Sequence, residues 1–101
     1  MALSLFDFPI PERGETFHTL LRRDECEIET IVSSNSPDNT LYNQPHDETV
    51  VLLEGAARLW IDGEEIELKA GDFLHILAHT PHRVLSTRAG TRWLALHWRK
   101  R

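Results

Sequence analysis

Apolar and polar residues alternate in short runs along most of this chain, and turn-forming residues separate the runs. Residues 24–33 show the two-residue period of a strand, with one face formed by Cys26, Ile28, Thr30 and Val32. Further strands are predicted over residues 50–53, 56–61, 64–69, 73–77, 82–86 and 91–98. About seven short strands with frequent turns are typical of an all-β sandwich or barrel.

The dipeptide Asp62-Gly63 is the clearest turn signal, because Asp-Gly favours the two-residue turn of a β-hairpin. That turn predicts a register in which apolar residues share one face. The predicted pairs are Ile61–Glu64, Leu59–Ile66 and Ala57–Leu68. A second hairpin is predicted around residues 88–90, between strands 82–86 and 91–98. In that hairpin His97 would lie opposite His82.

The first part of the chain is less regular. Pro9, Pro11 and Gly14 predict that residues 1–14 form an arm over the core. Residues 15–23 are ambiguous, since their apolar residues fit one face of a short helix. We expect a single domain of residues 1–101, in which residues 1–39 form an N-terminal arm and the first strands, and residues 40–101 form the barrel core.

Composition narrows the classes of function. The chain has 101 residues and a formal charge of −5, and its basic residues are scattered until the tail at 99–101. This predicts no nucleic-acid partner, since phosphate contacts need a concentrated positive face. No apolar run has the length of a bilayer span, so no membrane partner is expected. A single cysteine, Cys26, and no export-type leader predict the cytoplasm. Uncovered strand edges and the arm favour a homodimer.

Two segments carry most of the chemistry. The first has Glu48 and Gly55 separated by six residues, and the second runs from Gly71-Asp72 to His82. Together with the hairpin between them, these segments resemble the two motifs of the cupin family. The resemblance covers roughly residues 40–98. It implies a double-stranded β-helix, the jelly-roll barrel of the cupin type, which holds a metal ion near its mouth.

The departures from the family pattern decide the candidate ligands. The family usually has His-x-His before the glutamate, whereas this chain has Tyr42 and Gln44 at those positions. The resemblance therefore implies metal ligands at Glu48 and His82, with Gln44 as a neutral oxygen ligand. The fourth ligand would be His97 or His79. Tyr42 and His79 would orient a small ligand.

The pattern also predicts where the remaining histidines and the cysteine lie. His97 stays open, because the face of Leu94, Leu96 and Trp98 is more apolar and would turn His97 outward. His46 is predicted at the rim, after Pro45. His75 alternates with Leu74 and Ile76 and is predicted to be structural. Cys26 is predicted at an interior strand position and is not a candidate nucleophile.

Two hypotheses on function follow. The first is a metal-binding cupin of unassigned activity, in which one divalent transition metal (zinc, iron, manganese or nickel) acts on or binds a small polar molecule. The second is a non-catalytic domain that binds or senses a small ligand, with a degenerate or empty metal site. The sequence leaves open whether the protein is an enzyme, and it identifies no catalytic residue.

Overall fold

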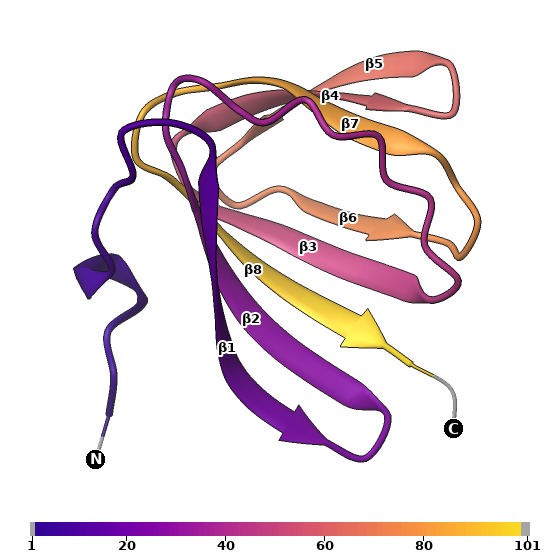
Figure 1. Ribbon diagram of the computed structural model, residues 1–101, viewed down its shortest axis with the longest axis horizontal. Coiled ribbons are helices and arrows are strands. Elements are labelled where there is room, and N and C mark those ends of the chain that lie inside the picture. Colours follow the sequence, from indigo (N-terminus) through magenta and orange to yellow (C-terminus); the bar gives the residue numbers. More distant parts are fainter. Residues whose placement is uncertain (1, 100–101) are drawn as a thin grey trace.

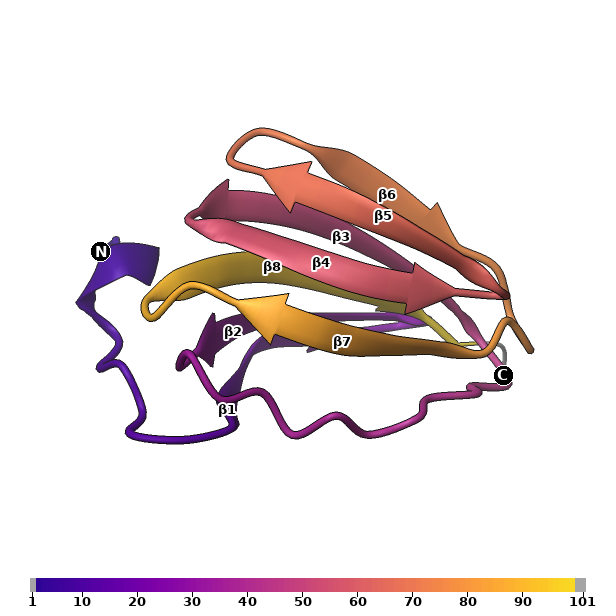
Figure 2. The same ribbon diagram turned by 90° about the horizontal axis from the view of Figure 1, so that it is seen from above.

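Two antiparallel β-sheets face each other in the computed structural model, which describes residues 2–99 (Figures 1 and 2). Lys100 and Arg101 of the basic tail lie outside the described residues. The five-stranded sheet has the order β1 (Glu15–Arg23), β2 (Cys26–Ser33), β8 (Thr91–Trp98), β3 (Asp47–Glu54) and β6 (Phe73–Ile76). The three-stranded sheet has the order β5 (Glu64–Lys69), β4 (Ala56–Ile61) and β7 (His82–Thr87). The all-β jelly-roll prediction is confirmed.

The β4–β5 hairpin has the predicted register. Asp62 and Gly63 both have positive φ, 45° and 94°, as this turn requires. The Cα partners are Ile61–Glu64, Leu59–Ile66 and Ala57–Leu68. The apolar face so formed enters the core, where Ala57, Leu59 and Leu68 are buried. Turn chemistry and hydrophobic pattern therefore determine this element locally.

The short helix considered for residues 15–23 is wrong, because these residues form strand β1. Its partner is β2, with Phe17 opposite Ile31 and Leu21 opposite Ile28. A β-bulge between Thr19 and Leu21 interrupts the two-residue period, which explains why the sequence resembled a helical pattern. The pairing with β2 supplies backbone hydrogen bonds that an uncapped helix of this length would lack at both ends.

The hairpin predicted between residues 82–86 and 91–98 is also wrong in its pairing. Strand β7 pairs with β4 in the small sheet, whereas β8 pairs with β2 and β3 in the large one. His97 therefore lies opposite Glu27 and Glu48 rather than His82. The connection through Arg88 and Gly90 crosses from one sheet to the other. A turn signal alone does not distinguish such a crossing from a hairpin.

The faces of β2 are the reverse of what its alternation suggested. Residues Thr30 and Val32 are fully buried, but they lie on the outer face of the large sheet, away from the other sheet. Glu29 and Ile31 point into the space between the sheets, where they line a cavity. Cys26 therefore belongs to the outer face and is half-buried, not interior.

The N-terminal arm runs over one end of the large sheet. It contains a short 3-10 helix, η1 (Leu5–Asp7), capped by the Ser4 side chain. The buried Arg92 donates hydrogen bonds to the carbonyl oxygens of Leu5 and Phe8, at 3.4 and 2.7 Å. The division at residue 39 stays a prediction, although β2 hydrogen-bonds along the whole of β8. Among the described residues, no helix is long and apolar enough to cross a membrane.

Candidate functional site

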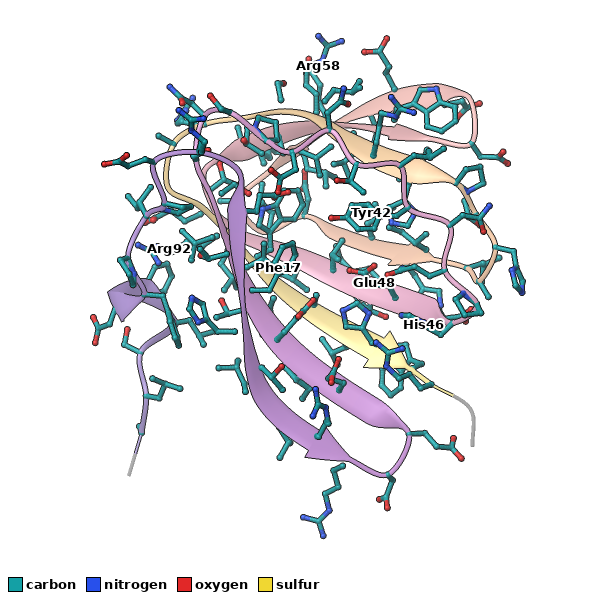
Figure 3. The ribbon with its side chains drawn as sticks, in the orientation of Figure 1. Phe17, Tyr42, His46, Glu48, Arg58 and Arg92 are labelled. Atoms are coloured by element: carbon teal, nitrogen blue, oxygen red, sulfur yellow. The ribbon has the colours of Figure 1, made fainter. Side chains whose placement is uncertain are left out.

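A cavity of about 100 Å³ lies between the two sheets, beside the segment of residues 34–46. Its wall is apolar, and a group of polar side chains projects into it. The apolar lining consists of Phe17, Ile31, Val50, Leu59, Ile76, Val84 and Trp93. The polar lining consists of Glu15, Glu29, Tyr42, Gln44, Glu48, His82 and His97. Figure 3 shows Phe17, Tyr42 and Glu48 in the space between the sheets.

Glu48 lies at the centre of the polar group. Its place near the start of β3 puts it on the same face as Val50 and Leu52, and it is 7% exposed. Gln44 Nε2 donates a hydrogen bond to Glu48 Oε1 at 2.9 Å. The Nε2 atoms of His82 and His97 lie 3.9 and 4.0 Å from the two oxygens of this carboxylate. The structure thus brings together the four residues that the sequence singled out.

His82 has one ring nitrogen fixed and the other directed at Glu48. Its Nδ1 lies 2.9 Å from the carbonyl oxygen of Thr80. A carbonyl oxygen only accepts, so Nδ1 carries the proton and Nε2 of the neutral ring keeps a lone pair. Tyr42 stacks on this imidazole with ring centroids 5.5 Å apart, and its backbone bonds to that of His82 in both directions. This is the orientation that metal-binding histidines commonly have.

His97 is buried, and both of its ring nitrogens form hydrogen bonds. Neither partner was predicted from the sequence. Its Nε2 lies 2.8 Å from Glu29 Oε1, and its Nδ1 lies 3.0 Å from His46 Nε2. His46, in the bend just before β3, is also 3.4 Å from Arg99. His97 therefore points inward, which resolves the two orientations that the sequence left open. His97 Nε2 could bind a metal only if its hydrogen bond to Glu29 were broken and replaced by the bond to the metal.

The surroundings of His97 and His46 shift the pKa values of these two imidazoles in opposite directions. Burial alone would lower the pKa of His97, but the hydrogen bond to Glu29 and the nearby charge of Glu48 outweigh burial and raise it. Burial lowers the pKa of His46, and the charges of Arg99 and His97 lower it further. A proton shared by the pair is therefore held on His97.

Glu15 and Tyr42 complete the polar lining. Burial raises the pKa of Glu15, although Ser33 donates a hydrogen bond to its carboxylate at 2.6 Å. Burial raises the pKa of Tyr42 as well, and the negative charges of Glu15 and Asp38 add to the effect. The phenol of Tyr42 thus stays protonated near neutral pH and can donate a hydrogen bond. This favours a ligand-orienting role for Tyr42 over metal ligation.

The structure does not bring His79 or His75 to the cavity. His79 is exposed on the loop before β7, with φ of 63°, and its backbone N–H bonds to the Gln44 carbonyl. It is not among the residues that line the cavity. His75 Nδ1 lies 2.8 Å from Thr49 Oγ1 and its Nε2 lies 3.2 Å from Asp47, outside the cavity.

Sequence reasoning missed Glu15 and Glu29. Both come from the first strands, outside the two family motifs. The alternation along β2 predicted the other face of the strand as the interior, so Glu29 was expected to point outward. That other face consists of Cys26, Ile28, Thr30 and Val32. The signal that could have found Glu29 is its place two residues before Ile31, on the same face of the strand, because a carboxylate beside a core residue is costly unless it has a partner.

The oxygen and nitrogen atoms of Gln44, Glu48, His82 and His97 are suitable ligands for a divalent metal. Their separations are wider than those around a bound metal ion. Within residues 2–99, no three His, Cys, Asp or Glu side chains already converge as a metal centre. Neighbouring ligand atoms at bonds of about 2.1 Å are roughly 3 Å apart. The separations of 3.9 and 4.0 Å around Glu48 are wider. A metal would therefore draw Glu48 and the imidazoles closer and would require the amide oxygen of Gln44 to turn inward.

Comparisons with known proteins agree with this fold. Residues 32–97 match the cupin domain family. A Ralstonia eutropha JMP134 protein, provisionally named as a mannose-6-phosphate isomerase, is 36% identical with a TM-score of 0.86, and the match covers 99% of each chain. A cupin superfamily protein of Desulfitobacterium hafniense DCB-2 has a TM-score of 0.86 at 19% identity, over 99% of this chain and 92% of its own.

One curated relative carries an assigned activity. Quercetin 2,3-dioxygenase of Bacillus subtilis (strain 168) is 45% identical over a 56-residue alignment, and the match covers 52% of this chain. This chain spans only 17% of the length of that protein. The similarity therefore concerns one part of the dioxygenase and does not extend to the whole enzyme.

Proposed function

Because this chain is a member of the cupin family, we propose that its cavity holds one divalent transition metal and binds a small polar molecule beside it. The observation that carries the proposal is the placement of His82, whose Nδ1 lies 2.9 Å from the Thr80 carbonyl oxygen while its Nε2 lies 3.9 Å from the buried Glu48 carboxylate. Gln44 and His97 are the remaining ligands. The family as a whole supports a metal and a small-molecule ligand, and the residues of this chain supply the donors for both.

The chain's own residues would prepare the cavity for chemistry. When bound, the metal supplies Lewis acidity toward an oxygen of the ligand. The apolar wall, which includes Leu59 and Trp93, excludes water around that oxygen. The phenol of Tyr42 donates a hydrogen bond to a polar group of the ligand. With its Nε2 on the metal, His97 would keep its Nδ1 contact with His46 Nε2, 3.0 Å away, which would hold the orientation of the ring.

Metal analysis of the untagged protein, purified without chelator, tests this proposal. We expect about one equivalent of zinc, iron, manganese or nickel in the wild type, as in a single closed site. Glu48→Ala and His82→Ala should lose it. His79→Ala is the matched control, because it removes an exposed imidazole outside the cavity and should retain the metal. Absence of metal from the wild type under every loading condition would overturn the proposal.

A second candidate is binding of a small ligand without metal. It is favoured by the hydrogen bond from Gln44 Nε2 to Glu48 and by the bonds that satisfy both nitrogens of His97. In that case chelator-treated wild type should still show ligand-dependent thermal stabilisation with a small polar compound, and Glu48→Gln should abolish it. The homodimer and the cytoplasmic location stay predictions.

A further inference from the structure

The cavity is lined by carboxylates but by no permanent positive charge. The side chains of Glu15, Glu29 and Glu48 face it, and no Lys or Arg of residues 2–99 belongs to its lining. Arg99 lies outside the lining and pairs there with Glu27 at 3.5 Å. A negatively charged group of a ligand would therefore enter an apolar cavity in which no cation can balance it.

A bound divalent metal would not reverse this balance. Its two positive charges would be offset by Glu48, a proposed ligand, and by Glu29, which lies 2.8 Å from His97. The carboxylate of Glu15 would remain in addition. Burying an ion without a partner of opposite charge costs much more free energy than burying an uncharged group that forms the same hydrogen bonds.

Glu15 lies away from the proposed metal ligands. Its partner on β2 is Ser33, which in turn pairs with Thr91 at the start of β8. Glu48 instead pairs with His97, near the end of β8. Positions 91 and 97 of one strand are about 20 Å apart. Glu15 and Glu48 therefore do not share a metal ion, and Glu15 is left to contact the part of a ligand that is remote from the metal.

One oxygen of Glu15 is free to accept a hydrogen bond from a ligand. Ser33 Oγ donates to Glu15 Oε2 at 2.6 Å, and Trp93 Nε1 donates to the same Ser33 oxygen at 3.0 Å. Within residues 2–99, no donor bonds to Glu15 Oε1. Burial raises the pKa of Glu15, and the negative charge of Asp38 adds to the effect. A donor on the ligand would replace part of the solvation that this carboxylate loses by burial.

We propose that the cavity binds uncharged small molecules that present a hydroxyl or amide donor to Glu15, and that it excludes their anionic counterparts. This inference rests on the proposed function, because it concerns the small molecule that binds beside the metal. The apolar wall, which includes Phe17 and Trp93, contacts the apolar body of such a ligand. Glu15 is then the residue that determines specificity at the end remote from the metal.

Calorimetric titration of the untagged full chain with isosteric pairs of compounds tests this selectivity. The pairs are protocatechuamide with protocatechuate, and vanillamide with vanillate. In each pair a carboxamide replaces a carboxylate, so the members differ in charge but hardly in size. We expect each amide to bind at least about tenfold more tightly than its carboxylate near neutral pH. A carboxylate that binds equally or more tightly would overturn the proposal, and so would failure of both amides to bind at millimolar concentration.

Glu15→Gln should reduce the preference for the amide several-fold. The change removes a charge that repels the carboxylate, and the glutamine oxygen can still accept the hydrogen bond from Ser33. Glu12→Gln is the matched control, because Glu12 is exposed on the N-terminal arm and does not line the cavity, so the preference should stay at the wild-type value. Circular dichroism can verify that both variants fold. An unchanged preference in Glu15→Gln would overturn the role of Glu15.

The same titrations of metal-loaded and chelator-treated protein separate this inference from the proposed metal site. Neither Glu15 nor Glu29 is a proposed metal ligand, so the amide should be preferred in both states. A protein that holds one equivalent of metal but prefers the carboxylate would overturn the selectivity alone. A protein that takes up no metal under any loading condition but prefers the amide would overturn the metal site alone.

Discussion

Glu29 Oε1 lies 2.8 Å from His97 Nε2, and both side chains are largely buried in the wall of the cavity. The two residues come from neighbouring strands, β2 and β8, but from parts of the chain 68 positions apart. Their contact gives His97 Nε2 a second carboxylate neighbour in addition to Glu48, which lies 4.0 Å away. Burial alone would lower the pKa of His97, but this contact and the charge of Glu48 together raise it.

We expect Glu29→Gln to lower the pKa of His97 in metal-free protein. The amide cannot supply the charge that, with the hydrogen bond, outweighs the effect of burial. Titration of the imidazole signals by NMR measures this change directly. Glu64→Gln, at the exposed start of β5, is the control and should leave the titration unchanged. An unaltered His97 titration in Glu29→Gln would contradict the electrostatic role of Glu29.

Glu15→Gln tests the pH dependence of stability. The pKa of Glu15 is raised from 4.5, so its contribution to folding is fully present below the unfolded pKa and is lost as pH rises through the folded pKa. A neutral glutamine does not suffer this loss. Relative to wild type, Glu15→Gln should therefore be more stable near neutral pH than below about pH 4.5.

Urea unfolding of both proteins at the two pH values measures this difference, since all other titrating groups are common to them. The hydrogen bond from Ser33 should survive, because the glutamine oxygen can accept it. Equal stability differences at both pH values would show that burial does not perturb Glu15.

Gly55→Ala should destabilise the fold by about 2 kcal/mol or more. Gly55 has φ of +95°, and a Cβ there would lie 2.8 Å from the Cα of Thr91, where backbone cannot yield easily. Gly63→Ala is the matched control, with φ of +94° and no atom within 4 Å of the added Cβ. It should cost only the backbone strain, about 1 kcal/mol.

Chemical unfolding of the two glycine variants separates the steric cost from the conformational cost. Equal losses would mean that the close approach between Gly55 and β8 relaxes at no cost.

Arg92→Lys should loosen the N-terminal arm. Lysine cannot match the planar guanidinium that reaches the carbonyl of Phe8 and also the carboxylate of Glu54, at 2.7 and 3.3 Å. Brief trypsin digestion followed by mass spectrometry should show faster cleavage after Arg13 than in wild type. Arg58→Lys, at an exposed ion pair of the small sheet, should leave this rate unchanged. A rate unaffected by Arg92→Lys would show that other contacts hold the arm.

Strands with strong local signals could be predicted from the sequence. Asp62-Gly63 and the alternation around it were enough for the β4–β5 register, because the turn geometry and the burial pattern agree. Glu48, Gln44 and His82 could be named for a similar reason, since they lie in two segments whose spacing is itself the signal. Their convergence in one cavity then follows from the family fold.

The partners of each strand in the two sheets could be read only from the folded chain. Strand β8 is apolar on both faces, so its pattern could not show that His97 points inward. The pairing with β2 and β3 decides that orientation, and the same pairing brings Glu29 to His97. Strand β1 was ambiguous because a bulge breaks its period, and the hydrogen bonds of β2 resolved it. Local pattern shows that a residue is buried, whereas the side from which it is covered depends on strands distant in the chain.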